Sequence, residues 1–228
     1  KIDDYFSDLL IDRRGTRQGF PQDVLGDIVR LAKFREVSTL RQTERKIDAL
    51  RQLDARGMRP TGDSVLRAVE SGDIELLDLL LRAGCSVHVK NPDGTPPLIV
   101  ALIKGYTIVA QMLLKAGVEV NDKDKRGLTP LMLACGRPVQ GYRAVAEALI
   151  KKGAFVNMRD SLGNTPLLLA LSGGTIDVAA LLIERGADLS AHTKDGETAL
   201  SLAKRSGNKL LIELIVEKLA AQTKGGPE

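Results

Sequence analysis

The feature that most constrains this sequence is an internal repeat. The pattern Gly-x-Thr-Pro-Leu, complete or with one substitution, starts at Gly94, Gly127, Gly163 and Gly196, at intervals of 33, 36 and 33 residues. A second set of glycines follows apolar runs at the same intervals, at Gly84, Gly117, Gly153 and Gly186. A fixed period of this length is typical of solenoids, in which each unit packs only against its neighbours. The sequence therefore predicts a stack of similar units rather than a closed globule.

Each unit indicates two helices followed by a turn. Thr129 and Thr165 can cap the first helix with a hydroxyl, and the proline that follows each of them fits the first helical turn. A glycine such as Gly105 or Gly174 interrupts the chain, and a second amphipathic helix runs to the closing glycine, which we expect to form a left-handed cap. The extended and Asp-rich stretch that follows, such as VNDKD, predicts a protruding hairpin, called a finger below.

The motifs TPLMLA, TPLLLA, KAGVEVNDKD, KKGAFVNMRD and ERGADLSA resemble the ankyrin-repeat family over roughly residues 61–219. The resemblance implies an all-α ankyrin-repeat solenoid of helix-turn-helix-finger units, in which fingers and inner helices line a concave face that binds proteins or peptides. We expect about five units over residues 61–221, with polar end units, and a disordered tail at 222–228. The sequence departs from the family where its frequent His after Thr-Pro-Leu is replaced, at Ile99, Met132, Leu168 and Ser201.

Residues 1–60 predict a helical extension that caps the first repeat. One amphipathic helix is expected behind Pro21, and a second over about residues 36–56, stopped by Gly57. The apolar side chains of this second helix share one face, at Leu40, Ile47, Leu50 and Leu53.

A rival interpretation of the same region rests on its charge. Residues 13–60 carry 12 Lys or Arg against 6 Asp or Glu. A basic segment built around Arg13, Arg14 and Arg17 could dock an acidic partner or a phosphate. The sequence also begins at Lys1 rather than Met, so we expect that it has been processed or cut from a longer chain. The alternative hypothesis is therefore a targeting or structural segment of a longer protein.

Composition argues against several function classes. With 33 basic and 29 acidic residues the net charge is only +4, and only 3% of the residues are aromatic, so nucleic-acid binding is not expected. No apolar run approaches the length of a membrane span. Cys85 and Cys135 lack the spacing of a zinc site and read as packed thiols, and His88 is far from His192 in the sequence. We expect no metal, no cofactor, no catalytic residue, and a chain that is monomeric alone.

Two surfaces are candidates for binding a protein partner. The fingers carry cations at equivalent positions, Lys90, Lys123, Arg159 and His192, with Lys125, Arg126 and Lys194 nearby. This basic ridge favours an acidic partner, although a solvated finger edge explains it equally well. On the inner helices, Leu102, Ile103 and Leu171 form an apolar anchor if they are exposed, and otherwise fill the space between repeats.

The turn residues of the fingers have structural explanations. His88 stands where later repeats have Asn121 and Asn157, a position suited to tying a finger's backbone together by a hydrogen bond. Asp124 and Asp160 can accept hydrogen bonds from backbone amides of their own turns.

The third unit contains an insertion of three residues within CGRPVQGY. Its first helix should end early and the connection should bulge outward, because a proline lies between two glycines. Such insertions are commonly neutral. The alternative is that Arg137, Val139, Gln140 and Tyr142 form part of a binding surface. Taken together, the sequence predicts a non-catalytic protein-interaction module that acts as a scaffold, an adaptor or an inhibitor.

Overall fold

The computed structural model describes residues 22–224. The chain divides into two compact units, residues 1–48 and 49–228. The basic candidates Arg13, Arg14 and Arg17 lie outside the described residues, so their role stays a prediction. The domain boundaries expected from the sequence, 1–60, 61–221 and 222–228, also stay predictions.

A single helix, α2 (Gln22–Ala55), replaces the two helices expected near the N-terminus. The prediction of two helices is wrong because no proline or glycine interrupts the chain around Arg35 and Glu36, so nothing ends the first helix there. Gly57 then adopts a left-handed conformation with φ +65°, and the helix stops as predicted. Within the first unit, the α2 side chains of Leu40 and Ile47 are exposed.

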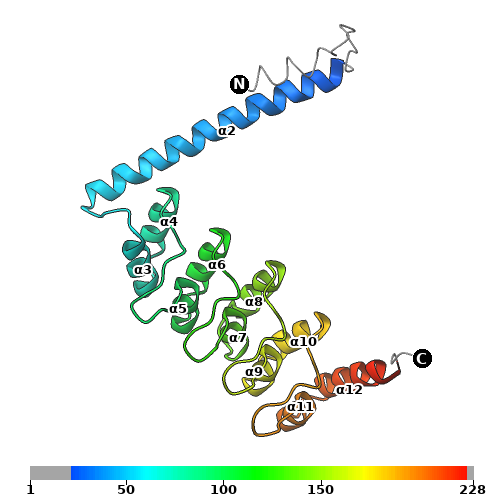
Figure 1. Ribbon diagram of the computed structural model, residues 1–228. Coiled ribbons are helices and arrows are strands. Elements are labelled where there is room, and N and C mark those ends of the chain that lie inside the picture. Colours follow the sequence, from blue (N-terminus) through cyan, green and yellow to red (C-terminus); the bar gives the residue numbers. More distant parts are fainter. Residues whose placement is uncertain (1–21, 225–228) are drawn as a thin grey trace, which may run out of the picture. The chain divides into compact units, whose positions relative to one another are not determined.

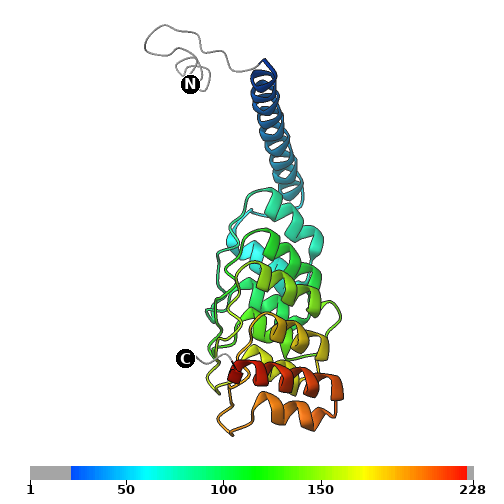
Figure 2. The ribbon, with the colours of Figure 1, turned by 90° about the vertical axis from the view of Figure 1, so that its right-hand side faces the viewer.

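The second unit is a stack of five helix pairs (Figures 1 and 2). The pairs are α3 (Gly62–Ser71) with α4 (Ile74–Arg82), α5 (Pro97–Lys104) with α6 (Thr107–Lys115), α7 (Pro130–Cys135) with α8 (Tyr142–Lys151), α9 (Pro166–Ser172) with α10 (Ile176–Glu184), and α11 (Ala199–Ser206) with α12 (Lys209–Lys224). The first helices of the pairs form one row, the inner helices, and the second helices form an outer row. Residues 22–224 contain no strand beyond an isolated bridge between His192 and Thr198. The predicted all-α repeat solenoid is confirmed.

Threonines cap four of the inner helices, and Thr61 does so for α3 by accepting a hydrogen bond from the amide of Ser64. The hydroxyl oxygens of Thr129 and Thr165 accept hydrogen bonds from the amides of Met132 and Leu168, each at 3.3 Å. Thr198 caps α11 in the same way. Pro96 gives α5 no side-chain cap, as its lack of a hydroxyl predicts.

Left-handed glycines separate the elements. The four closing glycines, Gly84, Gly117, Gly153 and Gly186, have φ between +81° and +88°. Side chains other than glycine rarely adopt this conformation, so the glycine spacing fixes where each outer helix gives way to a finger.

One apolar core runs through the second unit, from Ala49 and Leu53 in the last turns of α2 to Ile215 in α12. At equivalent positions each inner helix buries an alanine that is 0% exposed, namely Ala68, Ala101, Ala134, Ala170 and Ala203. The small side chains let neighbouring inner helices approach closely. Leucines such as Leu98 and Leu131, each 1% exposed, fill the remaining space, and each contributes about 1.5–3 kcal/mol through burial.

Candidate functional site

The four fingers, residues 86–95, 119–128, 155–164 and 188–197, form a hydrogen-bonded row along one edge of the stack. The Asp124 carboxylate accepts hydrogen bonds from the amides of Arg126 and Leu128, both at 2.9 Å. Asp160 does the same in the next finger. These contacts agree with the structural role predicted for both aspartates.

Adjacent fingers are also joined to one another. The amide of Ser161 donates to the carbonyl of Arg126 at 3.1 Å, and the amide of Lys194 donates to the carbonyl of Leu162 at 3.2 Å. Because backbone hydrogen bonds tie the second, third and fourth fingers together, the side chains of these fingers project from a fixed frame rather than from independent loops.

The side chains of two asparagines each join their finger to the next unit by two hydrogen bonds, an arrangement called the asparagine staple below. The Asn121 carboxamide donates to the Gly153 carbonyl at 3.1 Å and accepts from the Phe155 amide at 2.9 Å. Asn157 makes the equivalent bonds to the Gly186 carbonyl and the Asp188 amide, at 3.2 and 2.8 Å. His88 occupies the corresponding position in the first finger, but in the described part of the chain its imidazole makes no hydrogen bond. The structural hydrogen bond expected for His88 is therefore wrong.

Three of the seven residues of the predicted basic ridge are paired with carboxylates. Lys90 lies 3.4 Å from Asp122, and Lys125 lies 3.1 Å from Asp93. Arg126 pairs with Asp124 of its own finger at 3.1 Å. Because each of these three cations lies beside an aspartate, the finger edge carries less net positive charge than its basic residues alone suggest.

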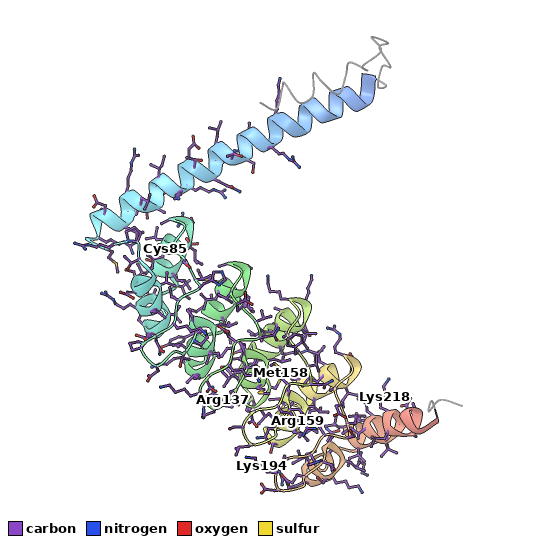
Figure 3. All side chains as sticks on the ribbon, in the orientation of Figure 1. Cys85, Arg137, Met158, Arg159, Lys194 and Lys218 are labelled. Atoms are coloured by element: carbon purple, nitrogen blue, oxygen red, sulfur yellow. The ribbon has the colours of Figure 1, made fainter. Side chains whose placement is uncertain are left out.

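The remaining finger cations differ in their surroundings. Arg159 donates to the carbonyl of His192 at 3.3 Å, and Arg159 and Lys194 come from neighbouring fingers (Figure 3). Lys123 and Lys194 are exposed and form no ion pair within residues 22–224. These two side chains keep a charge that a partner could use.

Asp188, at the start of the fourth finger, places a negative charge on the same edge. The Ser190 hydroxyl donates to its carboxylate at 2.6 Å and is the main reason why the pKa of Asp188 is lowered. The positive charge of Arg159 acts in the same direction. Asp188 therefore remains ionised well below neutral pH.

The apolar anchor expected on the inner helices is wrong for two of its three residues. Leu102 is 0% exposed and Leu171 is 5% exposed, because both side chains fill the space between neighbouring repeats. Ile103, one position further along α5, is 42% exposed. Of the predicted anchor, only Ile103 is available to a partner.

Three other inner-helix residues, which the sequence analysis missed, lie on the side of the inner helices that carries Ile103 and are largely buried. Val100, Leu133 and Leu169 each precede a buried alanine by one position, and Leu169 is half-buried whereas the first two keep 8 and 9% of their area exposed. Aligning the repeats on the buried alanines reveals this register. We call Val100, Ile103, Leu133 and Leu169 the inner-face strip.

The insertion after α7 faces back toward the preceding repeat. Tyr142 is 1% exposed, and its hydroxyl donates to the carbonyl of Leu102. The guanidinium of Arg137 donates to the carbonyls of Leu102 and Ile103, at 3.0 and 3.2 Å. Tyr142 as a partner-binding residue is therefore wrong, because its side chain is buried within the stack. The early end of α7, which has six residues against eight in α5, agrees with the predicted effect of the insertion.

Two further residues of the insertion, Val139 and Gln140, lie in different environments. Val139 is half-buried and packs against the core, while Gln140 is exposed. Arg137 is exposed although its guanidinium is occupied (Figure 3). The loop thus covers the last turn of α5, and the side chains that it exposes to a partner are mainly those of Arg137 and Gln140.

Burial also sets the chemistry of the groups that could react. It raises the pKa of the Tyr142 hydroxyl, and the nearby Arg137 opposes that shift only in part. It likewise raises the pKa of the Cys135 thiol, which stays protonated at neutral pH and is a poor nucleophile. Within residues 22–224, no group of three or more His, Cys, Asp and Glu side chains is placed to hold a metal ion. No helix in this range is long and apolar enough to span a bilayer.

Similarity to known proteins agrees with this geometry. The family model described as ankyrin repeats (3 copies) matches residues 65–160 and residues 139–224. No curated protein matches the chain.

Proposed function

Because the chain belongs to the ankyrin-repeat family, whose repeats are generally protein–protein interaction modules, we propose that residues 61–221 bind a protein partner through the fingers and the inner helices. In this proposal the chain is a non-catalytic scaffold, adaptor or inhibitor. The observation that carries it is the inner-face strip, in which the exposed side chain of Ile103 lies beside the half-buried Leu169 and the buried Val100 and Leu133.

The inner-face strip has the properties of a binding anchor. Ile103 exposes 42% of its area and Leu169 is half-buried, while Val100 and Leu133 beside them keep only 8 and 9% of their area exposed. A few apolar contacts surrounded by polar groups supply most of the energy of a protein interface. Lys104 and Arg137 flank the strip as exposed polar groups, which is the arrangement of an apolar centre with a charged rim.

The charges on the finger edge should increase the rate of association with a partner more than they increase the affinity. Among the described finger residues, Lys123, Arg159 and Lys194 are exposed and form no ion pair, and Arg159 already donates a hydrogen bond to the carbonyl of His192. Exposed charges contribute on the order of 1 kcal/mol or less each, but they speed association with a partner of opposite sign. We propose that the partner places acidic groups opposite Lys123 and Lys194 and apolar groups over the inner-face strip.

A matched pair of isoleucines tests this proposal. Ile103 and Ile176 have nearly equal exposure, 42 and 40%, but Ile103 lies on an inner helix and Ile176 begins the outer helix α10. The full chain would capture its partner from the native source, and binding of that partner would then be measured by titration. Ile103→Glu should weaken binding at least about tenfold. Ile176→Glu should leave binding unchanged, and melting temperatures should match. Equal loss in both variants, or loss only with Ile176→Glu, would place the interface elsewhere.

A further inference from the structure

A cavity lies between the first and second fingers. Its volume is about 200 Å³, and its walls come from both fingers and from the start of α5. Val87, His88 and Lys90 line it on the side of the first finger, and Val118, Glu119 and Asp122 line it on the side of the second. We call it the first inter-finger cavity.

The cavity coincides with the missing asparagine staple. In the two following fingers, a carboxamide bridges a closing-glycine carbonyl and the amide two residues later. The equivalent groups in the second unit are the carbonyl of Gly117 and the amide of Glu119. Neither has a hydrogen-bond partner among the described residues, because His88 does not reach them. The Gly117 carbonyl, an acceptor, and the Glu119 amide, a donor, are thus left near the cavity without the carboxamide that binds their equivalents in the following fingers.

The walls are apolar and the rim is polar. Val87 and Val118 are 5 and 9% exposed, and Leu98 is 1% exposed at the floor. At the rim, Lys90 and Asp122 neutralise each other at 3.4 Å, so neither requires a charged ligand. A dry apolar cavity of about 150 Å³ is large enough to take up benzene. The first inter-finger cavity is therefore large enough for one phenyl group.

We propose that the first inter-finger cavity receives one phenylalanine-sized side chain from an extended segment of the partner. The N–H and the C=O of the residue that carries this side chain, which point to the same side of an extended chain, pair with the Gly117 carbonyl and the Glu119 amide, the equivalents of the two groups that the asparagine carboxamides bind in the following fingers. This is backbone recognition with a side-chain pocket, as in other complexes with extended peptides. The proposal deepens the proposed function and rests on it, since it assigns a second anchor point to the same partner.

A small amide probe tests the cavity without the partner. N-acetyl-phenylalaninamide carries a phenyl ring and both amide groups, whereas N-acetyl-alaninamide carries only the amides. With the full ¹⁵N-labelled chain, titration with the phenyl probe should shift the amide signals of Val89 and Glu119, with a dissociation constant on the order of 1 mM. The alanine probe should shift them much less. Absence of these shifts, or equal shifts with both probes, would overturn the proposal.

Two variants close the cavity in different ways. His88→Asn restores the staple, so it should raise the melting temperature and weaken probe binding at least about tenfold. Val118→Phe should weaken binding by filling the cavity from its wall. His192→Asn makes the same chemical change in the fourth finger and should leave probe binding unchanged. Undiminished binding to both His88→Asn and Val118→Phe would overturn the proposal. Loss of the partner with Ile103→Glu remains a separate result, so the two proposals can fail independently.

Discussion

At the scale of single residues, much of the order in this molecule comes from side chains that bond the backbone of a neighbouring unit. Asn121 and Asn157 do so at the fingers, and Tyr142 does so inside the stack. Thr175 adds a hydrogen bond from its hydroxyl to the Cys135 carbonyl at 2.5 Å. The carbonyls of Leu102 and Cys135 belong to buried residues, and a buried carbonyl left without a partner costs about 1–3 kcal/mol, so the bonds from Tyr142 and Thr175 favour one register of adjacent units.

Tyr142 makes a pH-dependent prediction at this scale. Burial raises its pKa in the folded state above the ordinary tyrosine value of about 10. Its contribution to stability is therefore complete below that ordinary value, and it is lost as the pH rises from there through the folded-state pKa. Tyr142→Phe should cost about 1 kcal/mol at neutral pH and should flatten the fall in stability above pH 10. Urea denaturation at a series of pH values measures both effects.

Tyr106 provides the control for this measurement. It is half-buried, and its hydroxyl makes no hydrogen bond within the described residues. Tyr106→Phe should keep the wild-type dependence on alkaline pH. An equal flattening in both variants would contradict the role assigned to Tyr142.

At the scale of elements, the turns between inner and outer helices determine how closely two units stack. The turn after α7 and the turn after α9 meet at two glycines, Gly136 and Gly173. A Cβ atom at Gly173 would lie 2.4 Å from the Gly136 carbonyl oxygen, whereas a Cβ at Gly136 would have its nearest neighbour at 3.5 Å. Both residues have negative φ, so the need for glycine at Gly173 is steric and not conformational.

This asymmetry gives a prediction with a built-in control. Gly173→Ala should destabilise the second unit by about 1–3 kcal/mol, because backbone atoms of the adjacent turn would have to move. Gly136→Ala should change stability by about 0.5 kcal/mol or less. The denaturant midpoints of the two variants, compared with that of the wild type, measure these losses of stability. Comparable losses in both would show that the close approach of these turns does not limit stacking.

At the scale of the whole molecule, the repeat period was sufficient to predict the fold but not the binding surface. The helix starts at Thr129 and Thr165 and the turns at the closing glycines depend on local chemistry, so the sequence predicts them. The burial of Leu102 and Tyr142 depends on the neighbouring unit that packs against each of them, and one unit's sequence does not show which side is covered. The continuity of α2 was missed because an expected boundary had no residue to enforce it.

The account as a whole claims that fingers and inner helices, not outer helices, form the contact surface. Hydrogen exchange followed by mass spectrometry, on the full chain alone and bound to its captured partner, tests this most directly. We predict that the partner slows exchange in α5, α7 and α9 and in the first, second and fourth fingers, while the outer helices α6, α8 and α10 exchange at unchanged rates. Slowed exchange confined to the outer helices, with the inner helices and fingers unaffected, would contradict the account.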